Sequence, residues 1–347
     1  MSRYVERLLA AWTPATSTPL PTQLRLRADG LAELSSDSYL PREQHSYWMR
    51  LLQSSALVQH AVPVQNLIKS LNPSLIYSPY TDRLLGICDR PQVITCHDLT
   101  PLYWPDSRRA YLRSRFWLPR HLHGADCVVA ISRHVADLLL QKGLPAQRIA
   151  VIPNGIETAV EPLTVPAGPD LLLLARHARN KNIPLALRGF ARFLALNPRW
   201  DGRLVIVGST GRETPLLQRL EQQLGLESRI CWYPNLGAEA LEKKWRASFA
   251  LLSTSWMEGF DYPLLEAQAH GLPTLASKIP VHEELHRDVA LLVECSDDGI
   301  SLAAQLQRLA RDPSLWQQLS QAGLQNACYY SLERQCRNLH QLFGSLS

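Results

Sequence analysis

The sequence predicts an α/β protein with two doubly wound parallel-sheet domains. Short apolar runs that end in polar residues alternate with helix-length amphipathic segments from residue 75 onward. This alternation is typical of parallel strands covered by helices on both faces. It restarts after residues 157–169, a stretch that holds three prolines and few large apolar residues. A chain of 347 residues has room for two such domains.

The first half predicts a sheet preceded by a less regular segment. Residues 5–12 are expected to form a helix that Pro14 ends, residues 23–27 could form a strand, and residues 39–71 carry helix-spaced apolar positions. Further along, the expected strands are 74–78, 92–98, 125–132 and 148–152, and the expected helices are 107–122 and 135–142.

The second half repeats the alternation more regularly. In doubly wound sheets, ligands bind outside the carboxyl ends of the strands, so polar residues at those ends are the first candidates for a site. The expected strands are 171–175, 203–207, 229–232, 249–253, 273–277 and 290–293; the expected helices are 184–196, 214–224, 238–247 and 262–270, and residues 299–343 are expected to be helical.

Composition and charge exclude several classes of protein. Hydrophobic residues make up 46% of the chain and charged residues 19%, which excludes wholesale disorder. The net charge of +5 is too small to indicate nucleic-acid binding. Seven scattered cysteines without a CxxC pair indicate reduced thiols rather than disulfides or a zinc site. We expect a cytoplasmic protein, because no apolar run reaches the ~18–20 residues that span a bilayer and the N-terminus lacks a signal peptide.

Motif searches narrow the enzyme classes. The sequence contains neither a P-loop nor a G-x-S-x-G nucleophile elbow, and its nearest approach to a dinucleotide-binding fingerprint, residues 207–211, is too short. His282 and His286 match the H-E-x-x-H pattern of zinc hydrolases. The run is short, follows Pro280 directly and lies between two expected strands, so we interpret this match as a coincidence and expect no metal site.

Two cations follow the first strand of the second half. Arg176 and Lys181 lie in a polar loop at the carboxyl end of strand 171–175. Fixed positive charges at this position suit a diphosphate, whose negative charge must be neutralised as it leaves. A solvated basic loop explains the two residues equally well when they are taken alone.

Two acidic residues flank the start of a later helix. Glu258 lies in the loop after strand 249–253, and Glu266 lies inside helix 262–270. Gly259 permits a close approach of the backbone to a ligand, and the first N–H groups of the helix attract an anion. Carboxylates so placed can contact separate hydroxyl groups of one molecule, whereas the alternative is a capped surface helix with ordinary acids.

In the first half, His97 and Ser132 each lie at the carboxyl end of a predicted strand. A histidine at a strand end can hydrogen-bond a sugar hydroxyl or transfer a proton. A structural histidine is the alternative, so this position gains weight only from the second half.

These residues resemble the retaining glycosyltransferases of the GT-B fold in the glycosyl transferase group 1 family, also numbered family 4. The likeness covers about residues 70–340. The matching segments are specific to the family when taken together, whereas each segment alone is a weak signal. Residues 277–284 also resemble the segment that follows the Glu266 helix in that family. The likeness rests on five segments in order and spacing: His97-Asp98-Leu99-Thr100-Pro101, Ala130-Ile131-Ser132, residues 151–156, Arg176 with Lys181-Asn182, and Glu258 to Glu266 with Gly259-Phe260.

The resemblance implies transfer of a sugar from a nucleoside diphosphate sugar, with GDP-mannose slightly preferred, to a glycan or lipid-linked acceptor with retention at the anomeric carbon. Arg176 and Lys181 would bind the diphosphate, and Glu266 would hold the ribose hydroxyls. No DxD motif occurs, so no metal cofactor is expected. The implied catalytic residues are His97, Arg176, Lys181 and Glu258, and the implied donor-binding residues are Gly208, Gly259, Phe260, Asp261, Glu266, Asn154 and Ser132.

The resemblance also implies two Rossmann-like domains facing a cleft. An acceptor domain would span residues 1–156, a linker 157–169, a donor domain 170–325, and a C-terminal helix over 326–347 would cross back to the first domain. Family members normally begin with a strand and a Gly-rich loop, whereas this sequence starts on its first expected helix. We therefore expect the acceptor domain to lack its first strand.

Other interpretations stay open. A non-catalytic nucleotide-sugar-binding protein that lost its acceptor-side function is one, and a GT-B enzyme with another reaction, such as an epimerase or phosphorylase, is a second. Residues 108–117 interleave arginines with aromatic residues, which fits either peripheral contact with an anionic membrane or a solvated helix with one packed face.

Overall fold

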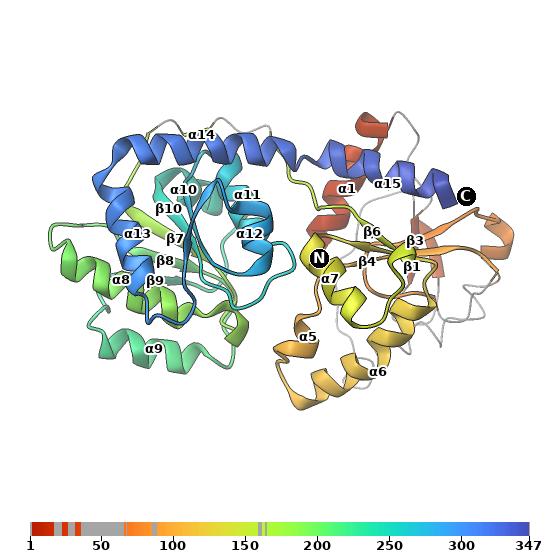
Figure 1. Cartoon of the computed structure of the whole chain (residues 1–347), viewed down its shortest axis with the longest axis horizontal. Helices are drawn as coiled ribbons and strands as arrows, with labels where there is room; N and C mark the ends of the chain where they lie inside the picture. Colours follow the sequence, from red (N-terminus) through yellow and green to blue (C-terminus); the bar gives the residue numbers. More distant parts are fainter. Residues whose placement is uncertain are drawn as a thin grey trace. The chain divides into compact units, whose positions relative to one another are not determined.

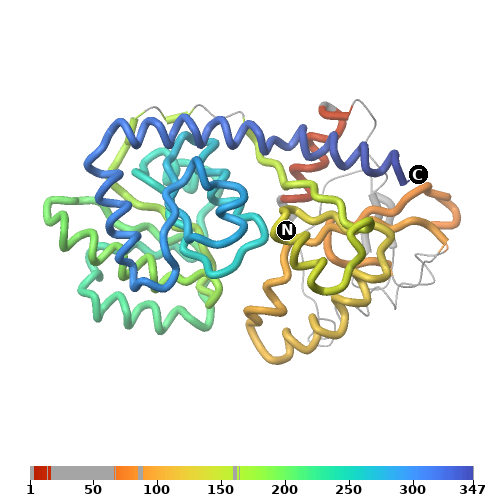
Figure 2. The backbone as a smooth tube through the Cα atoms, in the orientation of Figure 1, coloured from red at the N-terminus to blue at the C-terminus, as the bar shows by residue number. Residues whose placement is uncertain are grey.

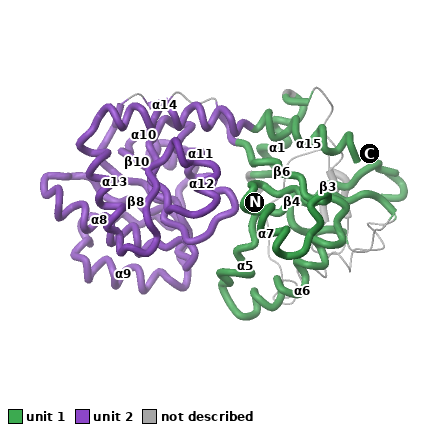
Figure 3. Tube along the Cα trace, viewed as in Figure 1, with its two compact units in different colours: residues 1–155, 332–347 green, residues 156–331 purple. Residues whose placement is uncertain are grey.

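The structure is a computed structural model that describes residues 2–16, 23–26, 32–35, 66, 68–84, 89–158, 162–163 and 165–346. They form two compact units, the first made of residues 1–155 and 332–347 and the second of residues 156–331 (Figure 3). The chain passes from the first unit to the second after Gly155 and returns at Leu332.

Among its described residues, the first unit has a four-stranded parallel sheet in the order β3-β4-β5-β6. Figure 1 labels β3, β4 and β6 of this sheet. The two central strands are buried along their whole length, as expected for a parallel sheet. The elements are β3 (Ile76–Ser78), β4 (Gln92–Cys96), β5 (Cys127–Ala130), β6 (Ile149–Val151), α5 (Thr100–Tyr103), α6 (Arg108–Gly124), α7 (Arg133–Gln141) and a 3₁₀ turn at Ala146–Arg148. A separate antiparallel pair joins β1 (Gln23–Leu26) to β2 (Ala32–Ser35). Most of the predicted segment 39–71 lies outside the described residues.

The first and last helices of the chain pack against each other in this unit, α1 (Ser2–Thr16) on α15 (Leu332–Leu346). Figure 2 shows α15 in blue crossing α1 in red. Tyr4, Leu8 and Trp12 recur at helical spacing and are buried, and Trp12 stacks on Phe343 at 5.9 Å between ring centroids. The prediction that Pro14 ends the first helix is wrong, because α1 continues through Pro14 while packed on α15.

The second unit is built on a six-stranded parallel sheet in the order β12-β11-β10-β7-β8-β9. A large apolar cluster on one face of this sheet includes Phe190, Phe193 and Trp316, and a second cluster around Trp245 covers the other face. Its strands are β7 (Asp170–Leu174), β8 (Leu204–Val207), β9 (Ile230–Tyr233), β10 (Ser248–Ser253), β11 (Thr274–Ser277) and β12 (Ala290–Val293). Its helices are α8 (Ile183–Leu196), α9 (Thr214–Gln223), α10 (Ala238–Ala247), α11 (Tyr262–Ala269), α12 (Pro280–His286), α13 (Ile300–Arg311) and α14 (Pro313–Tyr329), with a 3₁₀ turn at Arg179–Lys181.

The alternation predicted for the second half is confirmed strand by strand, with two refinements. The continuous helical region expected at 299–343 is three helices, because Asp312 caps α14 by accepting from the N–H of Leu315 and Pro313 opens that helix. Residues 277–284 were likened to a strand and loop, but from Pro280 onward the structure has helix α12. None of the helices in the described part of the chain has the length and apolar character needed to cross a bilayer.

Candidate active site

A crevice is expected where the connections of the second sheet change direction. After β7 the chain continues to β8 on one side of the sheet, and after β10 it continues to β11 on the other side, although β7 and β10 are direct neighbours. The loops that leave these two strands therefore diverge, and in doubly wound sheets ligands bind at such a switch point. Arg176 and Lys181 lie in the loop after β7, and Glu258 and Asp261 lie in the loop after β10.

The loop after β7 is held close to the neighbouring strand. A side chain at Gly208, directly after β8, would bring its Cβ within 2.0 Å of the carbonyl oxygen of Ala175. Only glycine therefore lets the two strand ends approach, and Gly208 here shapes the base of the Arg176 loop. The 3₁₀ turn then brings Lys181 to the start of α8, where Asn182 adopts a left-handed conformation with φ of 45°.

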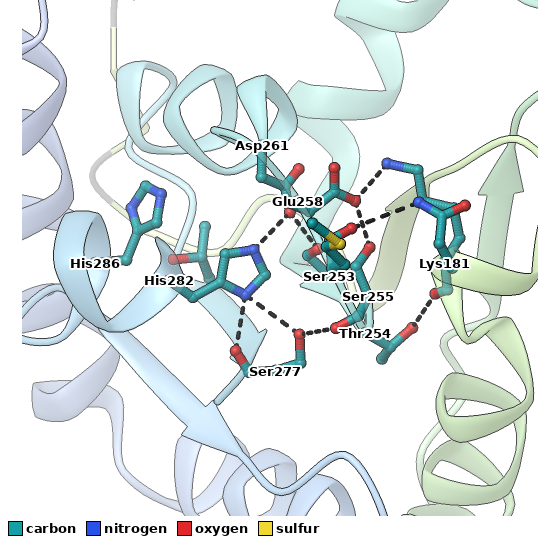
Figure 4. A network of polar contacts seen from close by, with 12 residues as sticks. Lys181, Ser253, Thr254, Ser255, Glu258, Asp261, Ser277, His282 and His286 are labelled. Carbon is teal, nitrogen blue, oxygen red and sulfur yellow. Dashed lines mark hydrogen bonds and ion pairs between the residues drawn. The ribbon is translucent and has the colours of Figure 1, made fainter. Parts of the chain in front are cut away.

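An ion pair joins the two loops. The ammonium nitrogen of Lys181 lies 2.5 Å from Oε1 of Glu258, and the hydroxyl of Ser255 donates to the same carboxylate oxygen at 2.6 Å (Figure 4). Both side chains are largely removed from water, with exposed fractions of 20% for Lys181 and 13% for Glu258. The pair is therefore mostly, but not wholly, shielded from solvent.

Further hydrogen bonds make the two loops one structure. The Thr254 hydroxyl donates to the carbonyl oxygen of Lys181 at 3.1 Å, and the backbone N–H of Trp256 donates to the carbonyl oxygen of Asn180 at 2.7 Å. The Asn180 amide donates in return to the carbonyl oxygen of Met257 at 3.5 Å. The Glu258 loop therefore has a backbone path fixed by its neighbour.

The surroundings of Lys181 favour the protonated, positively charged form of its ammonium group. Burial alone would lower the pKa of Lys181, but the negative charges of Glu258 and Asp261 outweigh that effect and raise it, while Arg176 opposes the rise. Burial raises the pKa of Glu258 and the charge of Lys181 opposes that rise. The influence of Arg176 on Lys181 places both cations in one electrostatic environment.

The helix that follows the Glu258 loop begins without a side-chain hydrogen-bond cap among the described residues. Asp261 precedes α11 in a left-handed conformation with φ of 67°, and Pro263 occupies its first turn. Phe260 is buried, with its ring centroid 6.1 Å from that of Tyr330. Gly259 is buried in the same loop, and Glu266 is half-buried one turn into α11.

Sequence reasoning missed a polar network behind the Glu258 loop. Asp261 accepts hydrogen bonds from the Ser253 hydroxyl and, at 2.9 Å, from Nε2 of His282, whose Nδ1 lies 2.7 Å from the carbonyl oxygen of Ser277 (Figure 4). Burial would raise the pKa of Asp261, but the hydrogen bond and charge of His282 prevail and lower it to about 2. Ser253 and Ser277 end neighbouring strands, which is the signal in the sequence that points to this network.

The two histidines of the H-E-x-x-H match form hydrogen bonds within or beside this network. His282 and His286 are both buried on α12, and both ring nitrogens of His282 are engaged by Asp261 and Ser277. Nδ1 of His286 lies 3.1 Å from the Gln268 amide nitrogen. The described residues contain no group of three or more histidine, cysteine or acidic side chains placed to hold a metal ion.

The remaining predicted residues belong to the first unit. His97 follows β4, its Nε2 lies 2.9 Å from the carbonyl oxygen of Pro79, its ring contacts that of Tyr4, and burial lowers its pKa. Ser132 follows β5 and caps α7 by accepting from the N–H of Val135 at 3.2 Å. Asn154 is buried and accepts from the Gln335 amide at 3.2 Å, and its own amide nitrogen has no partner within the described part of the chain.

Two family models match consecutive parts of the chain. The model described as Glycosyltransferase Family 4 matches residues 23–160, and the model described as Glycosyl transferases group 1 matches residues 168–312. Between them they span most of the chain, and the second includes both loops of the crevice.

The curated relatives that the chain matches are named as transferases. The chain is 26% identical over 258 residues to the O-antigen chain mannosyltransferase RfbU of Salmonella typhimurium, covering 73% of this chain and 66% of the relative. It is 29% identical to the exopolysaccharide phosphotransferase SCO2592 of Streptomyces coelicolor, covering 64% of this chain and 23% of the relative. It is 30% identical to the D-inositol 3-phosphate glycosyltransferase of Acidothermus cellulolyticus, covering 56% of this chain and 47% of the relative. The chain thus spans less than two thirds of the length of each of these relatives.

Solved structures share the fold. The sucrose-phosphate synthase of Thermosynechococcus elongatus has a TM-score of 0.75 at 21% identity, covering 99% of this chain and 92% of that chain. HepE of Anabaena, solved in complex with UDP, has a TM-score of 0.67 at 20% identity, covering 82% of both chains. The two parallel α/β units therefore have the GT-B architecture, which confirms the predicted fold class. With both family models matched in order, the chain belongs to the group 1 glycosyltransferases, family 4.

Proposed function

We propose that this chain transfers a sugar from a nucleoside diphosphate sugar to a glycan or lipid-linked acceptor. The observation that carries the proposal is the Lys181–Glu258 ion pair, which joins the loops after β7 and β10 at the switch point of the second sheet. Because the cation and the carboxylate lie side by side there, the cation can contact the diphosphate of such a donor and the carboxylate can contact its sugar.

The proposed chemistry assigns the cations to the leaving group. As the bond between the sugar and the diphosphate breaks, negative charge grows on the phosphate oxygens, and Lys181 and Arg176 would stabilise it. Lys181 has three N–H donors, so it can hold Glu258 with one and still offer others to phosphate. The first turn of α11, with its backbone N–H groups and positive dipole end, would assist. Because these groups neutralise the charge, the proposal requires no metal cofactor.

The carboxylates are assigned to hydroxyl groups. Glu258, with the backbone at Gly259, Phe260 and Asp261, would contact the donor sugar, and Glu266 would hold the ribose. His97 is proposed as a contact to the transferred sugar. Gly208 would act indirectly, since it lets the Arg176 loop approach β8.

Retention at the anomeric carbon and a GDP-mannose donor complete the proposal. The donor preference is supported by the names of relatives, since RfbU of Salmonella typhimurium and WbdA of Escherichia coli are mannosyltransferases. A galactosyltransferase among the relatives, the lipopolysaccharide 1,6-galactosyltransferase of Salmonella typhimurium, makes UDP-galactose the competing donor.

A thermal-shift screen of the full chain with GDP, UDP and ADP, and with GDP-mannose, UDP-galactose, UDP-glucose and ADP-glucose, tests the proposal. We expect the nucleotide with one of the three bases to raise the melting temperature of the chain. We also expect the sugar donor with the same base to be turned over when membrane extract supplies the acceptor. NMR of the product then reads the anomeric configuration. Stabilisation without turnover would favour the non-catalytic binding protein, and no stabilisation by any nucleotide would contradict both.

We also propose that α6 makes peripheral contact with an anionic membrane surface. The helix contains five arginines and no acidic residue. Leu112 and Phe116, one turn apart, are 63% and 50% exposed, and the Arg120 guanidinium lies 3.6 Å from the centre of the Phe116 ring. Exposed apolar groups among arginines suit insertion between anionic lipid headgroups, where a lipid-linked acceptor would be found.

A further inference from the structure

The loop that carries Glu258 is closed at its base by a side-chain contact. Ser253 ends β10 and Asp261 precedes α11, and the Ser253 hydroxyl donates to Oδ2 of Asp261 across the loop. Asp261 holds a left-handed backbone conformation, which costs free energy for a residue with a Cβ. A contact that fixes the Asp261 carboxylate therefore also fixes where the loop ends.

His282 supplies a second contact to the Asp261 carboxylate, and its surroundings define its protonation. Nε2 faces Oδ2 of Asp261 at 2.9 Å, and Nδ1 faces the carbonyl oxygen of Ser277 at 2.7 Å. A backbone carbonyl oxygen only accepts, and the Ser277 hydroxyl uses its single proton on the carbonyl oxygen of Ser255 at 2.6 Å. The Asp261 carboxylate already accepts from Ser253, so both ring nitrogens of His282 meet acceptors and both must donate.

We propose that His282 is a buried, doubly protonated histidine that positions the Glu258 loop, acting through Asp261 at one ring nitrogen and Ser277 at the other. Its role in catalysis rests on the function proposed above, in which Glu258 contacts the donor. Its protonation and its effect on the loop do not depend on that function.

The linkage reaches Glu258 from both ends of the loop. On one side His282 holds Asp261, three residues after Glu258. On the other side His282 orients Ser277, which holds the carbonyl oxygen of Ser255, while the Ser255 hydroxyl donates to Glu258 at 2.6 Å. Chains of hydrogen bonds in a buried site reinforce one another, so the loss of the central donor should loosen both ends together.

His282 also contributes to the pKa shifts of two neighbouring groups. The pKa of Asp261 is lowered to about 2, against the effect of its burial, chiefly by His282. The pKa of His286 is lowered to about 3 by its own burial and by the charge of His282. His286, equally buried on the same helix, offers a matched control.

The first experiment measures protonation directly by ¹⁵N NMR of the histidine side chains in the full chain at pH 7.5. We expect one histidine with two protonated ring nitrogens whose signals disappear in His282→Phe and persist in His286→Phe. If the His282 signals are those of a neutral ring, the proposal is wrong.

The second experiment measures the loop by hydrogen–deuterium exchange. We expect His282→Phe to raise exchange of the amides of residues 254–260 by ~10-fold or more, and His282→Gln, which keeps one donor, to raise it less. His286→Phe should leave these amides unchanged although it replaces an equally buried ring. Equal effects of His282→Phe and His286→Phe would reduce His282 to a general packing role and overturn the proposal.

A double-mutant cycle tests the link to catalysis. Nucleotide release is measured with whichever of GDP-mannose, UDP-galactose, UDP-glucose and ADP-glucose the parent chain turns over fastest. His282→Phe should lower kcat by ~10-fold or more with little change in KM, and this effect should vanish when Glu258 is already alanine. An undiminished effect in the Glu258→Ala background would show that His282 does not act through Glu258. If no donor is turned over, the proposed function fails while the NMR and exchange results still decide the positioning role.

Discussion

Lys181 and Glu258 lie 77 positions apart in the sequence, yet the ammonium nitrogen of one is 2.5 Å from a carboxylate oxygen of the other. The contact exists because β7 and β10 are neighbours in the sheet while their connections run to opposite sides of it. The pair therefore lies at the switch point of the sheet, where doubly wound sheets bind their ligands.

Replacement of Lys181 by alanine should cut sugar transfer by at least ~10²-fold, because a fixed cation would be lost from the departing diphosphate. Steady-state kinetics with the donor found by the thermal-shift screen measure the loss. Lys243→Ala is the matched control, since Lys243 pairs with Glu239 at 2.8 Å on the exposed surface of α10, where both side chains are at least 75% exposed. A Lys181→Ala chain as active as the Lys243→Ala chain would remove Lys181 from the site.

Substitutions of Glu258 and of Glu266 should affect different kinetic or binding parameters. Glu258→Ala should lower kcat by at least ~10²-fold because a contact that strengthens in the transition state is lost. Glu266→Gln should mainly weaken nucleotide binding, because its proposed partner is the ribose. Nucleotide affinity from calorimetry and kcat from initial rates separate the two effects, and parental behaviour of both variants would mean that the site is wrongly assigned.

The free energy of unfolding should decrease in acid, and the lowered pKa of His286 should contribute to this decrease. Its pKa is about 3 in the folded chain and close to the ordinary ~6.5 in the unfolded chain, so between these values only the unfolded chain takes up the proton. Stability therefore decreases as the pH falls through this window, by up to ~1.4 kcal/mol per pH unit for this one group. Urea unfolding from pH 7 to pH 4 should show a shallower decrease for His286→Phe. An identical slope in both chains would contradict the assignment.

Binding of the full chain to vesicles should depend on α6. Flotation with vesicles that contain a third phosphatidylglycerol should recover the parent chain, and recovery should fall in 0.5 M salt because the arginine contribution is screened. The double variant Leu112→Ser with Phe116→Ser should bind several-fold less. Leu216→Ser, which changes a residue of similar exposure on α9 in the second unit, should bind like the parent. Equal recovery of all three chains would exclude α6 as the contact.

The sequence predicted most of the second unit because each strand there is a short apolar run and each helix an amphipathic one. Helix 238–247 was placed at its observed bounds, and β12 was as well. The helix over residues 2–16 was drawn too short, because Pro14 is a local signal for a helix end while the packing of α1 on α15 is a contact between the two ends of the chain.

Within the site, the strand-end rule selected Lys181 and Glu258 correctly as neighbours, since both follow strands whose carboxyl ends meet. It could not select His282, because that residue lies in α12 and reaches the site only through Asp261 and Ser277. The H-E-x-x-H pattern marks His282 in the sequence, but it gives no sign of the contacts of this residue with Asp261 and Ser277. Which side chains a buried histidine will meet is decided by packing, and no short pattern in the sequence encodes it.

Calorimetric titration of the full chain with GDP and with UDP tests the central claim most directly, namely that the crevice between β7 and β10 binds the diphosphate of a nucleotide. One of the two nucleotides should bind at a single site, and Lys181→Ala should weaken it by ~10-fold or more, as for a lost hydrogen bond to a charged group. Lys243→Ala should bind as the parent does. If neither nucleotide binds, or if the Lys181→Ala chain binds as tightly as the parent, the crevice is not the donor site.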